Sequence, residues 1–309
     1  MVIKRPAYSS LVKEIKKGNF VLTGELEPEK TTGLEEILAS ARAMKPYVIA
    51  ANVTDNPLAM AFMNSLVPSY IVQRDVGLET VYQMVIRDRN RLALTSDILA
   101  AAHLGIKNIL AISGDHTALG DNKGGLPVYD LDSAQFVYLL HKMIDEGTDL
   151  VGNEIHGKVP INVGIAANPN ANPLEPEVLK IERKTKIGVD FIQTQTMFDI
   201  DLTKEFLKET ERLNCPTLIG IFPLKSFGIA DFFDKYIPGV HVPKDLLIAM
   251  EKCKDEPDKE KRKDLYDDVN MDFFGPFIKE IRKTTKAAGV HVMAVLYERI
   301  FEPLLEETL

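Results

Sequence analysis

Residues 104–113 read LGIKNILAIS, and they contain the end of an amphipathic helix, a glycine and a short run of apolar and β-branched residues. Residues 187–196, IGVDFIQTQT, repeat the same order. A glycine just past a helix end is favoured because it adopts the left-handed conformation without steric cost. A short run bounded by such turns is typical of a strand. Each segment therefore predicts a helix that returns directly into a strand.

This unit recurs along the chain, with longer helical stretches between short strands, which is the pattern of βα units around a parallel sheet. Eight runs are predicted as strands: Phe20–Leu26, Tyr47–Val53, Thr80–Ile86, Asn108–Ser113, Ile161–Ala166, Phe191–Thr196, Thr217–Ile221 and His291–Ala294. Helices are predicted at Gly33–Met44, Leu92–Leu104, Ser133–Glu146, Pro176–Ile187, Leu202–Leu213 and Pro257–Ala288. Eight parallel strands close a barrel. The sequence thus predicts one α/β domain over residues 1–309, a TIM-type (β/α)8 barrel with a helical insertion around residues 240–285.

Composition excludes several classes of protein. The 309 residues are 45% hydrophobic with a net charge of −8, which is typical of a globular protein and unlike a nucleic-acid-binding surface. The two cysteines and six dispersed histidines offer neither a disulfide framework nor metal-ligand spacing. No apolar stretch approaches the roughly 20 residues of a membrane span, and the first residues lack the apolar core of a secretion signal. We therefore expect a cytoplasmic protein without a metal site, a membrane span or a nucleic-acid partner.

Polar residues follow several predicted strands, at the end of the barrel where enzymes of this architecture carry their reacting groups. The first strand ends in residues 24–27 (GELE), where alternation places Glu25 and Glu27 on one face. One of these carboxylates is a candidate for the barrel mouth; alternatively both lie in solvent, because charged residues are almost never buried unless paired. The fourth strand runs into Gly114 and Asp115, and Asp115 is either a site residue or an ordinary turn or capping aspartate.

The sixth predicted strand ends in four polar residues, 193–196 (QTQT), whereas a buried parallel strand is normally almost continuous Val, Ile or Leu. Polar groups inside a barrel cost free energy unless they are hydrogen-bonded, so we expect amides here to face a ligand or ordered water. Asn168 and Asn172 lie in an amide-rich loop that suits a polar ligand and equally suits a turn. Arg183 and Lys184 on the following helix either meet a phosphate or form an ordinary surface pair.

These strand-end motifs resemble those of the methylenetetrahydrofolate reductase family. The matching elements are residues 24–28 (GELEP), 53–54 (VT), 109–116 (ILAISGDH), 166–169 (AANP), 193–199 (QTQTMFD) and 220–224 (GIFPL), with Phe227. They occur in the family's order and spacing over nearly the whole chain. The resemblance implies a barrel whose bound flavin takes a hydride from NADH or NADPH. The same flavin then reduces 5,10-methylenetetrahydrofolate to 5-methyltetrahydrofolate at one shared site.

The resemblance also implies a role for individual residues. Glu25 matches the acid that protonates the folate nitrogen as the imidazolidine ring opens. Asp115 matches an aspartate near flavin and pterin that tunes both without reacting. Gln195 matches the pterin-binding amide, and Phe227 matches an aromatic in the loop over the substrate. The implied flavin contacts are Thr54, Gln83, Ile112, Ser113, Gly114, Asp115, Asn168, Asn172, Arg183 and Lys184, the last two toward the phosphates.

Some positions depart from the family. Gln83 and Asn172 stand where many members have histidine, and the loop after Ser113 lacks a frequent arginine. These departures concern the adenine end of the flavin site, so FMN or a weak or vacant flavin site is an alternative to FAD. Residues 87–91 (RDRNR) resemble an element of a family branch in which some members pair with a second subunit. The candidate sources of electrons are NADH, NADPH, another donor or a partner subunit. The chain could also form a homo-oligomer.

Two other classes of function remain as alternatives. One is a flavin-free barrel that binds a pterin, such as a methyltransferase. The other is a subunit that serves as a non-catalytic scaffold. Glu25, Asp115 and Gln195 disfavour the scaffold, because a scaffold has no physical use for polar groups buried at a barrel mouth.

Overall fold

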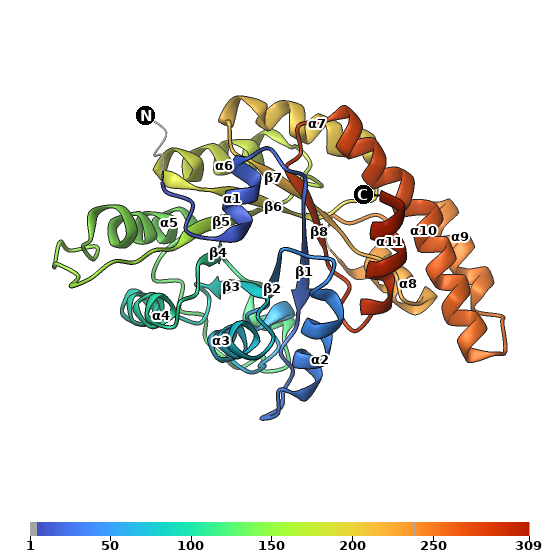
Figure 1. The fold of residues 1–309 in the computed structure, drawn as a ribbon, viewed down its shortest axis with the longest axis horizontal. Helices are drawn as coiled ribbons and strands as arrows, with labels where there is room; N and C mark the ends of the chain where they lie inside the picture. The colour runs from blue at the N-terminus through green and yellow to red at the C-terminus, as the bar shows by residue number, and fades with distance from the viewer. Residues whose placement is uncertain (1–4, 238, 309) are drawn as a thin grey trace.

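The protein is described by a computed structural model covering residues 5–237 and 239–308. Eight parallel strands form a closed barrel, in which each strand pairs with the next along the chain and β8 returns to β1 (Figure 1). The strands are β1 (Val21–Leu26), β2 (Ala50–Val53), β3 (Glu79–Val85), β4 (Asn108–Ile112), β5 (Asn162–Ala167), β6 (Phe191–Thr196), β7 (Thr217–Ile221) and β8 (Gly289–Val292). The predicted (β/α)8 fold and its eight strands are confirmed.

The predicted helices are present as α2 (Glu35–Met44), α4 (Arg91–His103), α5 (Ser133–His141), α6 (Glu175–Gly188), α7 (Ile200–Thr210) and α10 (Lys259–Thr284). The sequence reasoning missed α1 (Ser10–Lys16), α3 (Leu66–Asp75), α8 (Phe227–Tyr236) and α11 (Phe301–Thr308), whereas α9 (Lys244–Cys253) lies within the predicted helical insertion. In α3 the misleading signal was Pro68, which a helix tolerates in its first turn. Over the described ranges, no helix combines the length and apolar character needed to cross a bilayer.

An apolar floor closes the amino-terminal end of the barrel. Its inward-facing side chains are Val21, Val81, Leu110, Phe191 and Leu218, and all of them are buried. Helix α1 packs Leu11, Val12 and Ile15 against this set and lies across the ring of strands (Figure 1). Water is therefore excluded from this end of the barrel, so access to the interior must come from the carboxyl ends of the strands.

A polar layer lies directly above the floor. Alternate residues of a strand face the same side, so the residue two positions after a floor residue also points inward. Thr23 follows Val21 in this way, and Gln193 follows Phe191. The inward polar set comprises Thr23, Asn52, Gln83, Gln193 and His291, and every member is buried. The barrel interior is thus apolar at its base and polar beneath its mouth.

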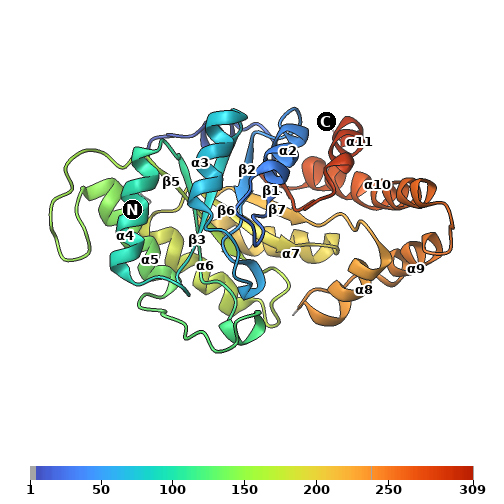
Figure 2. The same cartoon turned by 90° about the horizontal axis from the view of Figure 1, so that it is seen from below.

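The chain between β7 and β8 contains α8, α9 and α10, which lie together on one side of the barrel (Figure 2). Asn270 of α10 is fully buried and binds the backbone of Leu224 in the loop after β7. Its Oδ1 accepts a hydrogen bond from the Leu224 N–H at 2.7 Å, and its Nδ2 donates to the Leu224 carbonyl at 2.9 Å. The long helix therefore fixes one of the loops that border the barrel mouth.

Phe191 offers a test of the floor. A Cβ placed on Gly164 would lie 2.4 Å from the Phe191 ring, so this ring fills space that the glycine leaves open. We expect Phe191→Ala to lower the free energy of unfolding by about 3–5 kcal/mol, because it leaves a cavity in the core. Phe232→Ala, at a ring that is 42% exposed, should cost less than about 1 kcal/mol. Urea unfolding would measure both, and equal losses would contradict the floor's importance.

Candidate active site

Glu25 lies near the carboxyl end of β1, with a side chain that is only 13% exposed. Its Oε2 accepts a hydrogen bond from Gln83 Nε2 of β3 at 3.3 Å and lies 3.4 Å from His291 Nε2 of β8. Strands on both sides of β1 therefore hold the carboxylate in place above the polar layer. The structure thus places Glu25 at the barrel mouth and not in bulk solvent.

His291 links Glu25 to the interior of the barrel. Its Nδ1 lies 3.0 Å from Thr23 Oγ1, and Gln193 Nε2 donates to the same hydroxyl at 3.5 Å. Gln193 and Asn52 exchange two amide hydrogen bonds, of 2.8 and 3.2 Å. These contacts are compatible with a tautomer in which the Thr23 hydroxyl donates to Nδ1 of His291 and the Nε2–H points at Glu25. Thr23, Asn52, Gln193 and His291 form one connected network, and Gln83 joins it through Glu25.

The two oxygens of Glu25 differ in their surroundings. Both donors, the Gln83 amide and the His291 ring, converge on Oε2. Within residues 5–237 and 239–308, Oε1 has no hydrogen-bond partner. A proton on the carboxyl group would therefore reside on Oε1, because a proton on Oε2 would oppose two incoming donors. Glu25 is oriented so that its free oxygen can exchange a proton with a bound molecule.

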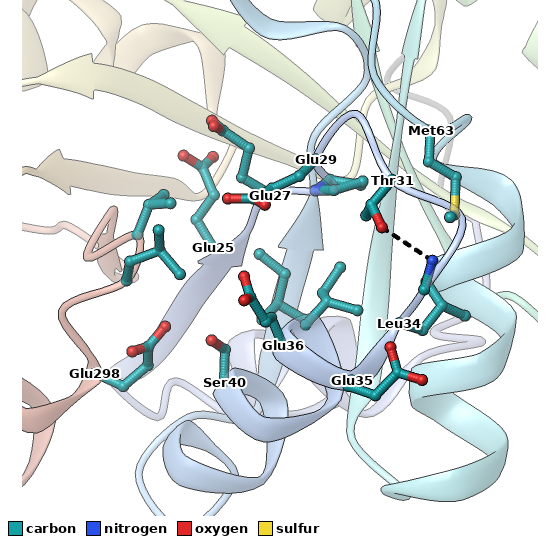
Figure 3. Close-up of a pocket in the computed structure, with 16 residues that line it drawn as sticks. Glu25, Glu27, Glu29, Thr31, Leu34, Glu35, Glu36, Ser40, Met63 and Glu298 are labelled. Carbon is teal, nitrogen blue, oxygen red and sulfur yellow. Dashed lines mark hydrogen bonds between the residues drawn. The ribbon is translucent and has the colours of Figure 1, made fainter.

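A cavity of about 210 Å³ opens beside Glu25, between the end of β1, helix α2 and the loop after β8 (Figure 3). Its lining includes the carboxylates Glu25, Glu27, Glu29, Glu35, Glu36 and Glu298, and neither lysine nor arginine. Burial raises the pKa of Glu27 to about 7, and the charges of Glu25 and Glu29 add to this effect, whereas Lys225 opposes it. The cavity is therefore a region of negative potential at neutral pH.

Asp115 follows β4 at the same end of the barrel, and its side chain is exposed. Its Oδ2 accepts a hydrogen bond from the Leu58 N–H at 3.1 Å, in the loop after β2. Gly114 makes the bend before it, with a φ of +76°, and a Cβ there would lie 3.1 Å from Val85. Only glycine adopts this conformation at little cost in so tight a space. Asp115 thus stands at the rim with one carboxylate oxygen fixed.

Gln195 and Phe227 lie at separate points of the rim. Gln195 is exposed in β6, and its Oε1 accepts a hydrogen bond from the Thr196 N–H at 2.9 Å. Phe227 is half-buried at the start of α8, where the Lys254 ammonium lies 5.1 Å from the ring centroid. Neither side chain lines the cavity beside Glu25. In β6 the buried amide is Gln193, and protein groups satisfy it, so the expectation that both amides face a ligand does not hold for Gln193.

Two of the predicted cofactor residues have polar groups without a protein partner. Thr54 is buried after β2, and its hydroxyl has no hydrogen-bond partner in the described part of the chain. Lys184 of α6 is only 4% exposed, and no described carboxylate forms an ion pair with it. Burial lowers the pKa of Lys184 to about 8, and the charge of Lys180 adds to this effect, whereas the charges of Glu177 and Asp132 oppose it. Both groups are suited to receive a polar or anionic ligand.

The remaining predicted cofactor residues are spread over the loops around the mouth. Arg183 is exposed and lies 3.5 Å from Asp132. Asn168 is half-buried, and its Oδ1 accepts the Asn170 N–H at 3.1 Å, which is a turn interaction. The others are Ile112, half-buried at the end of β4, and Ser113 and Asn172, both exposed. Gln83 is set apart from them, because its amide faces Glu25 inside the barrel.

Three residues of the site escaped the sequence reasoning: Thr23, Asn52 and His291. Each is a polar residue on a strand whose neighbours are apolar, and each faces inward. The period-two pattern that singled out Glu25 could have found Thr23 two residues earlier on the same strand. Among the described residues, no group of three or more His, Cys, Asp or Glu side chains is arranged to hold a metal ion.

The raised pKa of Glu27 predicts a pH-dependent stability. A carboxyl group with a pKa near 7 in the folded chain and about 4.3 when unfolded destabilises the folded state as pH rises through this interval. We expect the stability of the native chain to fall between about pH 4.3 and 7, relative to Glu27→Gln, which should be the more stable variant at pH 8. Thermal unfolding at pH 5 and 8 would measure this, with Glu209→Gln at an exposed position of α7 as the control. A constant difference between Glu27→Gln and the native chain would contradict the assignment.

Comparison with known proteins places this barrel in a family. The family model of methylenetetrahydrofolate reductase matches residues 10–308. The 5,10-methylenetetrahydrofolate reductase of Salmonella typhimurium is 22% identical over 282 residues, which are 87% of this chain and 85% of that protein. Methylenetetrahydrofolate reductase 1 of Schizosaccharomyces pombe is 22% identical over 242 residues, 74% of this chain, but the match spans only 37% of the yeast protein.

A solved structure shares the fold. An uncharacterized protein from Clostridium thermocellum, which binds two copies of 5-methyl-5,6,7,8-tetrahydrofolic acid, superposes with a TM-score of 0.62 at 14% identity. The match covers 96% of this chain and 97% of that one. At this identity the likeness concerns the fold alone, whereas the family model matches nearly every residue from the first helix onward. The chain belongs to the methylenetetrahydrofolate reductase family.

Proposed function

We propose that this protein reduces 5,10-methylenetetrahydrofolate to 5-methyltetrahydrofolate, using a bound flavin that supplies the hydride. The observation that carries the proposal is Glu25, a carboxyl group held at the barrel mouth by Gln83 and His291. The substrate holds its one-carbon unit in a ring between two nitrogens, so opening the ring requires a proton on the departing nitrogen. A positioned acid for such a step is typically worth about 10²–10⁴-fold in rate.

Glu25 would deliver this proton from Oε1, the oxygen that its neighbours leave free. Oε2 stays bound to Gln83 and His291 in both protonation states, so the side chain does not rotate when the proton leaves. The donors also stabilise the carboxylate that forms. Thr23 keeps His291 in the tautomer that presents Nε2–H to Glu25. The polar layer thus orients Glu25. The proton that Glu25 donates does not have to pass through the apolar floor.

Asp115, Gln195 and Phe227 would bind and orient the substrate. Opening the ring creates a cationic folate, and the exposed carboxylate of Asp115 at the rim favours a positive charge nearby. Gln195 offers an amide nitrogen and oxygen to the pterin, although its Oε1 must first release the Thr196 N–H. Phe227 begins α8, next to the loop that Asn270 fixes, and an aromatic ring there can cover a planar ligand and exclude water.

The residues present are compatible with a flavin at this end of the barrel. Among the described residues, Thr54 carries a buried hydroxyl without a partner, and Lys184 is a largely buried lysine that forms no ion pair, although the charges of Glu177 and Asp132 favour its charged form. A phosphate near Lys184 would favour the charged ammonium form of this lysine, which burial disfavours. Gly114 lets the chain after β4 turn tightly against Val85 and Arg87, which places Ser113 and Asp115 at the rim. These features support FAD or FMN, and Ile112, Ser113, Asn168, Asn172, Gln83 and Arg183 remain proposed contacts.

Electrons would come from NADH, NADPH or a partner subunit. The RDRN element, whose resemblance suggested a partner, is used within this chain. Arg89 forms a 2.5 Å ion pair with Asp55, and Asn90 caps α4 by accepting the Ala93 N–H at 3.0 Å. These side chains are therefore occupied by intramolecular contacts, and the element by itself gives no support for a second subunit.

An absorption spectrum tests the function. We expect the purified protein to carry flavin bands, or to gain them on incubation with FAD or FMN, and mass spectrometry would identify the released chromophore. Adding 5-methyltetrahydrofolate without oxygen should bleach these bands, because the reverse reaction transfers a hydride from 5-methyltetrahydrofolate to the flavin. A protein that binds 5-methyltetrahydrofolate but takes up neither flavin would refute the proposal and favour the flavin-free pterin-binding function.

A further inference from the structure

We propose that Arg87 is a positioning residue for Asp115, and that its guanidinium group sets the place of the Asp115 carboxylate at the barrel mouth. The inference rests on the proposed function for the role of Asp115, but the contacts that carry it do not. Arg87 follows β3 and is only 2% exposed, although arginine is rarely buried without a specific task. Its donors are directed at the two loops on either side of its own strand.

Each of these loops is bound through its backbone. Arg87 Nη1 donates to the carbonyl of Asp115 at 3.0 Å, in the loop after β4. Arg87 Nη2 donates to the carbonyl of Asn56 at 3.2 Å, in the loop after β2. One rigid planar group thus fixes the separation of two chain segments that come from opposite neighbours of β3.

Asp115 closes the arrangement into a ring. Its own Oδ2 accepts the N–H of Leu58, two residues after Asn56, at 3.1 Å. The path runs from Arg87 to the Asn56 carbonyl, along the chain to Leu58, across to the Asp115 carboxylate and back through the Asp115 carbonyl. Removing Arg87 opens this ring, and the Leu58 N–H alone cannot hold a carboxylate on an exposed rim in one orientation.

The surroundings of Arg87 are built for a guanidinium group. Its Nε and Nη2 bind both oxygens of Asp88, at 2.8 and 2.7 Å, which compensates the charge, and Asn56 Nδ2 also donates to Asp88 at 3.1 Å. A Cβ on Gly114 would lie 3.2 Å from Arg87 Nη1, so the loop after β4 passes directly against the group. A lysine has one nitrogen and cannot reach two carbonyls and a carboxylate in this planar geometry.

Arg91 provides a control from the same sequence segment, residues 87–91 (RDRNR). It is exposed and pairs with Asp130 at 2.8 Å, on the side of α4, without a contact to Asp115. The variants Arg87→Gln, Arg87→Lys and Arg91→Gln would be made in the native chain and in an Asp115→Ala background. Thermal unfolding of each variant would confirm that it folds. If Arg87→Gln does not fold, Arg87→Lys takes its place in the measurements.

The first measurement is hydrogen–deuterium exchange by mass spectrometry, which needs no flavin or folate. Arg87→Gln and Arg87→Lys should raise exchange in peptides that contain Leu58 and Asp115 to about the level of Asp115→Ala. Adding either substitution to Asp115→Ala should raise exchange at Leu58 little further. Native exchange at Leu58 in both Arg87 variants would overturn the proposal, whatever the protein's function.

The second measurement is the coupling of the two residues in function. Affinity for 5-methyltetrahydrofolate and the rate of folate reduction should fall at least about tenfold on loss of Arg87 in the native chain, since small misplacements of a site carry large costs. The same substitution should change both less than twofold once Asp115 is alanine, and Arg91→Gln should have little effect in either background. Equal losses in both backgrounds would show that Arg87 acts independently of Asp115 and overturn the proposal. If no variant binds folate while exchange behaves as expected, the proposed function fails and the positioning of Asp115 stands.

Discussion

Five buried polar side chains inside the barrel must find hydrogen-bond partners in one another or in Glu25, and the geometry of the site depends on this constraint. An unpaired amide or imidazole in such a place costs about 1–3 kcal/mol. Asn52 and Gln193 pair with each other, Gln193 reaches Thr23, and Thr23 orients His291. At the top of the layer, His291 Nε2 and Gln83 Nε2 both converge on Glu25 Oε2. The orientation of the proposed acid is therefore a consequence of how the interior is filled.

The two ends of the barrel have opposite physical roles. The floor of Val21, Phe191 and their neighbours, sealed by α1, supplies stability and excludes water. The mouth carries charges that are only partly compensated: a buried lysine on α6, a carboxylate on the rim and an acidic cavity beside Glu25. Such groups reduce stability in the absence of a ligand, which is the usual trade between stability and function in a site. A phosphate of the flavin that we propose would compensate the lysine, and the cationic folate formed on ring opening would face the carboxylates.

Much of the fold could be predicted from the sequence, because it rests on local signals. Strand β6 was found to the residue, since glycine and apolar runs mark its ends. Helix α3 was missed because Pro68 and its β-branched residues favour other structures, and packing against β3 overrides them. Glu25 could be identified from the alternation along β1. His291 could not, because its importance arises from contacts with Glu25 and Thr23, which precede it in the chain by 266 and 268 positions. Similarly, residues 87–91 resembled an element of a family branch in which some members pair with a second subunit, and only tertiary structure shows that Arg87 and Arg89 bind within the chain.

The central claim is that Glu25 donates the proton that lets a folate ring open and accept a hydride. Anaerobic stopped-flow reduction of 5,10-methylenetetrahydrofolate by the pre-reduced flavoprotein tests it most directly, with native chain and Glu25→Gln compared. The glutamine side chain keeps an oxygen that can accept the hydrogen bonds made to Glu25 Oε2. It has no acidic proton to give to the departing nitrogen. The account predicts that flavin reduction by the electron donor stays within about twofold, while the folate step slows by about 10²–10⁴-fold. Equal loss in both steps, or an undiminished folate step, would contradict it.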